Sequence, residues 1–290
     1  MSLYSHETIF DDSKLQVRFE ILSIFNEIYP AHWHSHIEIL LVLTGSMTAY
    51  INDHVYELQS HNMLLINPKD IHSTQAHGEV NYILLQIPHA NLKLLLPDLE
   101  LLHFQEFFDS LAENNPSNDC LEICLMQMKQ CFEEKEDGYQ LHFTSLLYDF
   151  LYILYKQHTT KLTLHNREKA DRDFQRIEQI ITFVKKNYQK QITLKEAAAN
   201  LSLSTEYFCR LFKKYTNQTF LEYVNTVRLI NFYNDLIQSK DSITYLLEKN
   251  GITNYKVFMR MFKGTYGVTP NRIRNHNKDI QRIPTNKTMS

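Results

Sequence analysis

Hydrophobic positions follow one pattern in the first third of the chain and another in the rest. Through the first hundred residues they form short runs separated by turn signals such as Thr44-Gly45 and Asn67-Pro68. Short apolar runs at regular spacing predict β-strands arranged as a small barrel or sandwich. We expect strands at residues 17–22, 37–43, 47–51, 55–58, 63–66 and 82–87, with a tight hairpin at 51–55.

The spacing changes near residue 92. Residues 121–132 and 140–157 carry apolar side chains at helical intervals, which predicts two amphipathic helices. Residues 159–171 are polar and weakly patterned, so we expect a linker there. Beyond it, apolar residues again recur at helical spacing from Phe174 to Tyr188, and they predict the first helix of a separate C-terminal domain.

The last hundred residues contain one segment twice. The first copy begins at Thr193 and reads TLKEAAANLSLSTEYFCRLFKKYTNQTF; the second begins at Ser242 and reads SITYLLEKNGITNYKVFMRMFKGTYGVTP. Thr193 and Ser242 lie 49 positions apart, and after a one-residue insertion Phe212 and Phe262 lie 50 apart. Repetition at a fixed spacing indicates one supersecondary unit used twice.

Local capping signals show what this unit is. Thr193 and Glu196 form the pattern of a capping box, and Ser204, at the end of the short turn 202–204, is a suitable N-cap for a second helix. That second helix is expected to end at Asn217, and its counterpart in the second copy at Gly267, because both residue types tolerate the left-handed backbone of a C-cap. Each copy is therefore predicted to be a helix-turn-helix, whose second helix enters the DNA major groove.

The outward positions of these two recognition helices define the expected DNA contacts. Arg210 and Arg260 are expected to read base edges, and Lys213 and Lys263 to contact phosphates. The full set predicted to bind DNA is Thr205, Glu206, Cys209, Arg210, Lys213, Lys214, Asn254, Tyr255, Lys256, Met259, Arg260 and Lys263.

Charge supports a polyanionic partner for the C-terminal part. Residues 172–290 hold 20 Lys and Arg against 9 Asp and Glu, whereas residues 1–171 hold 10 against 24. The near-neutral total of −3 therefore conceals two halves of opposite sign. Such asymmetry is typical of a protein with one domain directed at nucleic acid.

Composition argues against several other classes. The four cysteines lack paired-ligand spacing, the six glycines form no phosphate-binding loop, and no Ser/His/Asp or Cys/His catalytic arrangement is visible. The N-terminal segment has no signal-peptide core, and no apolar run reaches the ~18 residues of a membrane span. We expect a cytoplasmic protein with no membrane association, no catalytic residues, no cofactor and no enzymatic activity.

These features together resemble the AraC family of transcription regulators. The most specific part is 193–274, which ends in Phe258-x3-Phe262-Lys263 and Tyr266-Gly267-Val268-Thr269-Pro270. The resemblance implies a cupin-type sensor, a dimerising helix pair near residues 120–157, and two recognition helices entering successive major grooves. Three positions depart from the family pattern with bulkier side chains, which is expected to require local repacking: Phe232, Leu247 and Ile252.

A cluster of histidines in the sensor half carries the sharpest chemistry. Residues 32–38 read HWHSHIE and Gly45 follows after six further residues, which resembles the first cupin metal motif, H-x-H-x3-E-x6-G; Pro68-Lys69-Asp70-Ile71-His72 resembles a shortened second motif. Alternate positions of a strand share a face, so the polar side chains are expected to point into the barrel. The predicted ligand-binding residues are His32, His34, His36, Glu38 and His72.

Three roles for these residues remain open at this point. In sensors that resemble this chain, the same strand commonly lines an effector pocket without metal, where imidazole and carboxylate hydrogen-bond a sugar or another small polar ligand. Imidazoles with one carboxylate are also a suitable set of ligands for a divalent transition metal. The third alternative is a structural polar core.

We therefore expect an α+β multidomain protein, with a cupin-like β-barrel, a helical pair and a C-terminal all-α domain of two helix-turn-helix units. It is expected to be a sequence-specific transcription activator that responds to a small polar ligand such as a sugar. Its expected partners are double-stranded DNA, the effector, a second copy of the chain and RNA polymerase. The alternative is a metal-dependent cupin enzyme or metal sensor fused to a DNA-binding domain. Expected boundaries are 1–100 for the sensor, 101–158 for the dimerisation segment, 159–171 for the linker, 172–278 for the DNA-binding domain and 279–290 for a polar tail.

Overall fold

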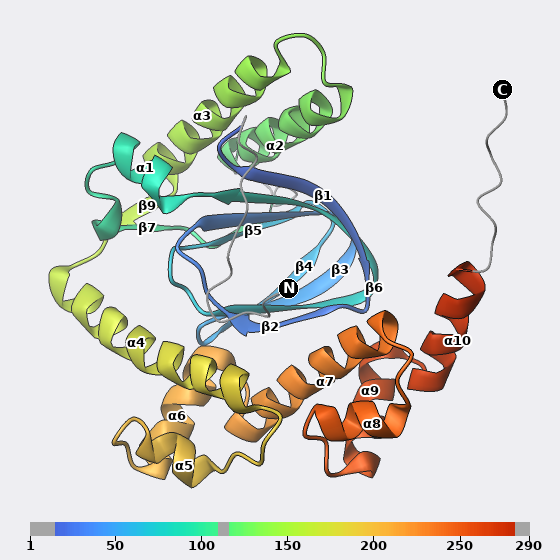
Figure 1. The fold of residues 1–290 in the computed structure, drawn as a ribbon. Helices are drawn as coiled ribbons and strands as arrows, with labels where there is room; N and C mark the ends of the chain where they lie inside the picture. Colours follow the sequence, from blue (N-terminus) through green and yellow to red (C-terminus); the bar gives the residue numbers. More distant parts are fainter. Residues whose placement is uncertain (1–14, 110–115, 282–290) are drawn as a thin grey trace, which may run out of the picture.

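The N-terminal half forms a strongly curved antiparallel sheet in a computed structural model that describes residues 15–109 and 116–281 (Figure 1). Its strands follow the order β1-β6-β3-β5-β8, with β2 paired to β6 and β4 paired to β3. The strands are β1 (Arg18–Phe25), β2 (Ile28–His32), β3 (Ile37–Ile51), β4 (His54–Gln59), β5 (Asn62–Ile66), β6 (His72–Ile87) and β8 (Phe107–Asp109).

Two long strands, β3 and β6, form the spine of this sheet. They pair antiparallel over most of their length, from Ile37 opposite Ile87 to Ile51 opposite His72. The sequence predicted two strands at 37–43 and 47–51, because Thr44-Gly45 was interpreted as a turn. The structure has one strand with register shifts at this point, so the glycine marks an irregularity of the ladder and the strand continues. The predicted hairpin at 51–55 is confirmed, since Ile51 pairs with His54.

Strand alternation divides the sheet into an outer and an inner face. Ile39 and Leu41 of β3 belong to the core shared with the helices α2 (Pro116–Glu134) and α3 (Tyr139–Gln157). Leu40 and Val42, one position along, belong to a second core inside the curved sheet. Glu38 shares the parity of Leu40, so its carboxylate belongs to the inner face.

The helix pair and the C-terminal helices lie on opposite sides of the sheet (Figure 1). Between them, α1 (His89–Leu95) and a 3₁₀ helix (Leu99–Leu101) precede β7 (Leu102–Phe104) and β9 (Thr159–Lys161), which pair with each other. The C-terminal half contains α4 (Leu164–Asn187), α5 (Leu194–Ala199), α6 (Thr205–Thr216), α7 (Phe220–Gln238), α8 (Ile243–Lys249), α9 (Tyr255–Tyr266) and α10 (Pro270–Gln281).

The predicted boundaries differ from the structure in three places. Strand β8 pairs with β5, so the sheet domain extends past residue 100. The stretch 159–171 was expected to be a linker, but it forms β9 and the first turns of α4. Strand β9 is stabilised by pairing with β7, and α4 begins at Leu164. Residues 279–281 of the expected tail belong to α10, and the remainder of that tail, 282–290, lies outside the described residues.

The local signals of the repeated units are confirmed. Thr193 and Glu196 form a complete capping box at the start of α5, and the Ser204 hydroxyl accepts a hydrogen bond from the backbone N–H of Tyr207 at the start of α6. Asn217, with φ 53°, and Gly267, with φ 70°, end α6 and α9 in the left-handed conformation. Both units therefore have the predicted helix-turn-helix form, with α7 joining them.

The bulky departures from the family pattern pack together in the second unit. Phe232 and Leu247 are buried in the core between α7, α8 and α9, and Ile252 packs against it. The Phe232 ring meets Phe258 edge to face at 4.9 Å between ring centroids. The larger side chains are therefore accommodated within one hydrophobic core of the second unit.

Among the helices of residues 116–281, not one is both long and apolar enough to cross a lipid bilayer. The four cysteines, all within the described ranges, are free thiols.

Candidate functional site

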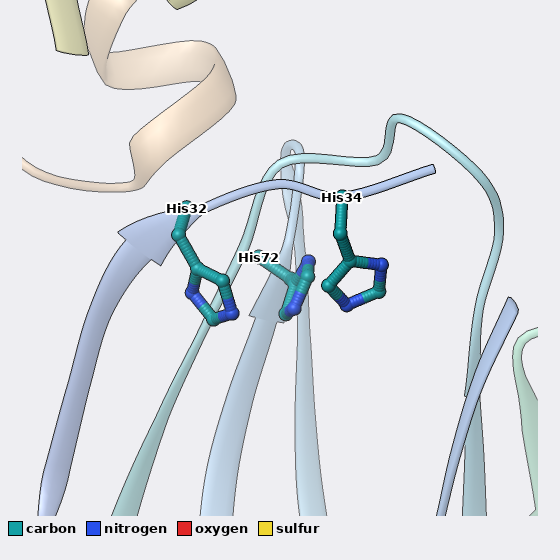
Figure 2. A group of neighbouring side chains, drawn as sticks. All are labelled: His32, His34 and His72. Atoms are coloured by element: carbon teal, nitrogen blue, oxygen red, sulfur yellow. The ribbon is translucent and has the colours of Figure 1, made fainter. Parts of the chain in front are cut away.

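Three histidines converge at one end of the curved sheet. His32 is the last residue of β2, His34 lies in the link from β2 to β3, and His72 is the first residue of β6. Figure 2 shows their rings side by side, entering the same space from these three segments. The ring centroids of His32 and His72 are 4.1 Å apart and those of His34 and His72 are 4.9 Å apart. All three side chains are buried.

The backbone path that brings them together is different from the predicted one. The sequence placed residues 32–38 on one strand, but β2 ends at His32 and β3 begins at Ile37. The residues between cross the end of the sheet, where the N–H of Lys69 donates to the His34 carbonyl at 2.9 Å. His32, His34 and Glu38 still face inward, but His36 is half-buried and lies outside the cluster. Its expected place among the ligand-binding residues is therefore not supported by this geometry.

Backbone carbonyls orient all three imidazoles. Nδ1 lies 2.9 Å from the Pro30 carbonyl in His32, 2.9 Å from the Asp70 carbonyl in His72 and 3.2 Å from the His36 carbonyl in His34. A carbonyl oxygen only accepts, so each Nδ1 carries a proton. In a neutral ring Nε2 then holds the lone pair, which is the form that ligates metals and accepts hydrogen bonds.

Glu38 lies next to the histidines, and its carboxylate contacts both His34 and Gln86. Its Oε2 is 2.9 Å from His34 Nε2 and accepts a hydrogen bond from the side-chain amide of Gln86. Both nitrogens of His34 thus face oxygen atoms, and both contacts are hydrogen bonds only when the ring is doubly protonated. Burial alone would raise the pKa of Glu38, but the hydrogen bond with His34 and the charge of that ring hold it well below its ordinary value.

His72 is the least satisfied member of the cluster. Its Nε2 is buried and has no hydrogen-bond partner among the described residues; the nearest carboxylate oxygen, Glu38 Oε1, is 4.0 Å away. The pKa of His72 is lowered to about 3. Burial is the largest cause and the neighbouring His32 the second, while the charge of Glu38 acts in the opposite direction. The ring is therefore neutral at physiological pH, and it directs an unused lone pair at the centre of the cluster.

The cluster borders a small cavity inside the sheet. The cavity measures about 100 Å³. His32, Glu38 and His72 provide one end of its wall. The remainder is mainly apolar and aromatic, formed by Leu22, Ile24, Tyr29, Leu40, Met47, Ala76, Tyr82 and Leu84, with Arg18 and Thr74.

The residues next to the histidines form the contact with the C-terminal half. Ala31 and Ile71, which directly precede His32 and His72, are buried in one core with α4, α6 and α7. The hydroxyl of Tyr223 on α7 donates a hydrogen bond of 3.0 Å to the Ala31 carbonyl. Trp33 meets Phe174 of α4 edge to face at 4.7 Å between ring centroids, so this tryptophan packs against the C-terminal half. The histidine cluster and the first helix-turn-helix unit therefore share a wall.

A second, larger hollow lies between the two halves. This cleft measures about 390 Å³ and is bordered by the 67–71 loop, by α4 and by Lys214 and Tyr215 at the end of α6. Lys69 reaches across it to Asp171 at 3.5 Å. Burial raises the pKa of Asp70 at its wall to about 7; the Asn52 hydrogen bond opposes this shift, and the charge of Glu106 reinforces it. The sequence does not predict this cleft, because segments about a hundred positions apart form it and none of them has a local signal.

The predicted DNA-contacting residues lie on the outer faces of α6 and α9. Ten of the twelve are exposed, while Thr205 and Met259 are half-buried. Asn254 caps α9 by accepting a hydrogen bond from the N–H of Val257, and Met259 packs against the core of the second unit, so both have structural roles as well. Lys214 borders the interdomain cleft, unlike its neighbour Lys213.

Two family models match the two halves of the chain. The family described as AraC-like ligand binding domain matches residues 25–151, and a family described as Helix-turn-helix domain matches residues 197–276. The HTH-type transcriptional regulator YdeC of Bacillus subtilis, itself described as uncharacterized, is 24% identical over 84% of this chain and 86% of its own. The HTH-type transcriptional activator RhaS of Mannheimia succiniciproducens is 23% identical over 86% of this chain and 90% of its own. Among solved structures, ToxT of Vibrio cholerae is 15% identical over 90% of this chain and 98% of its own, with a TM-score of 0.48.

Fold, site and family matches define a class: a DNA-binding transcription regulator with an N-terminal ligand-binding domain and a C-terminal helix-turn-helix domain. Within that class, the chain belongs to the AraC family.

Proposed function

We propose that this regulator activates transcription by binding specific DNA through α6 and α9, and that a ligand at His32, His34, Glu38 and His72 controls this binding. The observation that carries the proposal is the shared wall: Ala31 and Ile71 lie next to the histidines in sequence and are buried against the first helix-turn-helix unit. A relative named as a transcriptional activator, which matches most of this chain, supports activation, and with it contact to RNA polymerase. The protein works by binding alone and in the cytoplasm, without catalysis.

Exposed basic side chains support the DNA-binding role of both recognition helices. Arg210 and Lys213 project from α6, and Arg260 and Lys263 occupy the equivalent positions of α9. Arginine at such positions makes bidentate contacts with guanine, whereas lysine near a helix end contacts phosphate. One protomer then reads two segments of DNA about one helical turn apart.

The size of the hollows bears on the ligand. A cavity of about 100 Å³ is well below the ~300–1,000 Å³ of typical small-molecule sites, so the histidine cluster suits a very small ligand. A sugar, which the family resemblance suggests, fits the interdomain cleft of about 390 Å³ better. The cleft is lined by residues of both halves, and the cavity is lined by His32 and His72, the sequence neighbours of Ala31 and Ile71. We therefore expect occupancy of either hollow to change the position of α6 and α7 relative to the sheet.

Dimer formation through the helix pair is supported by its outer face. Large apolar side chains are exposed there at helical spacing: Ile123 and Met126 on α2, and Tyr148, Tyr152 and Tyr155 on α3. Exposed apolar side chains that recur along a helix commonly mark a protein interface. We infer that a second copy of the chain covers this face, which places two DNA-binding domains on one operator.

The experiment that tests the proposal begins by selecting DNA from a random library with the full chain. Affinity for the selected site is then measured with and without a panel of monosaccharides and divalent metal ions. We expect one of them to change the affinity by about 5-fold or more, the usual lower range of allosteric coupling. Tyr223→Phe removes the hydroxyl that contacts Ala31 and is expected to reduce this change, because a ligand shifts an equilibrium only through contacts that differ between the two states.

Tyr245→Phe on α8 is the matched control, because that tyrosine is 53% exposed and lies away from the sheet. It should respond like the wild type. An undiminished response in Tyr223→Phe would show that this contact does not transmit the signal. If the full chain selected no preferred sequence at all, sequence-specific DNA binding itself would be refuted.

A further inference from the structure

We propose that His32, His34 and His72 bind a divalent transition-metal ion through Nε2, with Glu38 Oε1 as the fourth protein ligand. The proposal deepens the assignment of this cluster as a ligand site and rests on it, but it requires no particular DNA sequence or target. Each of the three histidines offers one ring nitrogen, and these nitrogens lie within 4.8 Å of one another.

The unused nitrogen of His72 is the observation that points to an ion. Its Nε2 is buried, faces the cluster and lacks a hydrogen-bond partner within the described residues. A second histidine cannot satisfy it, because His32 already uses the proton on Nδ1 for a backbone carbonyl. Glu38, which only accepts when ionised, cannot donate to it. A cation is the partner that suits the unused lone pair of His72, two neighbouring imidazoles and one carboxylate together.

The orientation of the rings is the one that metal-binding histidines need. Metal-ligating imidazoles almost always donate their other N–H to a carbonyl or carboxylate, which fixes both tautomer and ring position. Here the carbonyls of Pro30, Asp70 and His36 take this role for the three rings, at 2.9, 2.9 and 3.2 Å. Gln86 likewise holds Glu38 Oε2 and leaves Oε1, the oxygen nearer His72, for the ion.

The spacing requires only a small closure. Ligand nitrogens around a tetrahedral zinc ion, with bonds of about 2.0–2.1 Å, lie about 3.3 Å apart. The histidine nitrogens lie within 4.8 Å of one another, so movements of about 1 Å in the side chains bring them to a common centre. His34 must also exchange its contact with Glu38 for the ion, and this displaces a proton.

The surroundings indicate what the ion would do. The cavity of about 100 Å³ beside the cluster leaves room for water or one very small ligand on the open side of the ion. Ala31 and Ile71, next to two of the ligands, are packed against the first helix-turn-helix unit. Closure of the rings around the ion therefore pulls on the same segments that contact α7, which makes the metal itself a candidate signal for DNA binding.

Cobalt(II) is a suitable probe, because its visible absorption reports coordination by nitrogen ligands. The full-length protein is freed of metal with a chelator, dialysed and titrated with Co²⁺, and the bound ion is then displaced by Zn²⁺. We expect about one ion per chain, with absorption bands that saturate at that ratio. His72→Ala and His34→Gln should each weaken binding by at least about 10-fold, while His54→Ala, which changes an exposed histidine of the same domain, should bind like the wild type.

Circular dichroism of each metal-free variant shows whether it is folded. If a histidine variant does not fold, Glu38→Gln provides the second test, because it keeps the size of the side chain and its acceptor for Gln86. Failure of the wild type to bind Co²⁺ or Zn²⁺, or equal binding by folded His72→Ala, would overturn the proposal. DNA binding by the same metal-free protein separates the two ideas: specific binding without any metal uptake refutes the metal site and leaves the regulator function intact.

Discussion

Gly251 is expected to be essential for the stability of the second helix-turn-helix unit. It lies in the turn of the second helix-turn-helix with φ +67°, and a Cβ added there would collide with the backbone carbonyl of Gln189. Gly251→Ala therefore combines left-handed backbone strain with a clash that no side-chain rotation relieves. We expect a loss of at least about 2 kcal/mol in the free energy of unfolding, measured by urea denaturation.

Gly264→Ala is the matched control for that change. Gly264 lies inside α9, and a Cβ there meets no atom within 4 Å apart from the backbone of its own helix and its chain neighbours. Alanine is the better helix former, so this variant should be more stable by about 0.5–1 kcal/mol. Loss of stability in both variants, or in neither, would contradict the role assigned to the turn.

Two adjacent lysines at the end of α6 test the orientation of the recognition helix. Both are exposed, but Lys214 also borders the interdomain cleft. Loss of one phosphate contact reduces the slope of log affinity against log salt concentration by about 1. We expect this reduction for Lys213→Ala and an unchanged slope for Lys214→Ala, in titrations of the selected DNA at several salt concentrations. The reverse result would mean that α6 is rotated about its axis relative to DNA.

At the scale of elements, the sequence predicted the helix ends that local capping residues determine. The capping box at Thr193 and the left-handed residues Asn217 and Gly267 mark where helices begin and end, and the structure confirms each. The extents of the strands depend instead on pairing between segments that are distant in the sequence. Residues 37–51 form one strand because β6 pairs with them on both sides of Gly45, and 159–161 form a strand because β7 lies beside them.

The helix pair carries a prediction of its own. Ile123→Asp on α2 and Tyr152→Asp on α3 place a charge in the exposed apolar face, where a second copy is inferred to bind. Burying an unpaired charge in an interface is strongly unfavourable, so the dimer should dissociate at least about 10-fold more readily in sedimentation experiments. Val55→Asp, which changes an exposed apolar residue of β4, should leave the dimer intact. A monomeric wild type would contradict the inferred interface.

At the scale of the whole molecule, the feature that matters most has no local signature. His32, His34, Glu38 and His72 could be selected from their spacing, because the motif lies in two short segments. The contact that links them to DNA binding could not, since Tyr223 and Ala31 are 192 positions apart and tyrosine on a buried helix face is ordinary core. The interdomain cleft escaped prediction for the same reason. Only the packing of one half against the other reveals either.

Both helix-turn-helix units of one protomer are proposed to read DNA, and a footprint on the selected site tests this most directly. The full chain should protect two segments per protomer, about 10 bp apart. Arg210→Ala on α6 should remove protection at one segment and Arg260→Ala on α9 at the other, each at a cost of about 1–3 kcal/mol in specific binding. A single protected segment that survives Arg260→Ala unchanged would contradict the account.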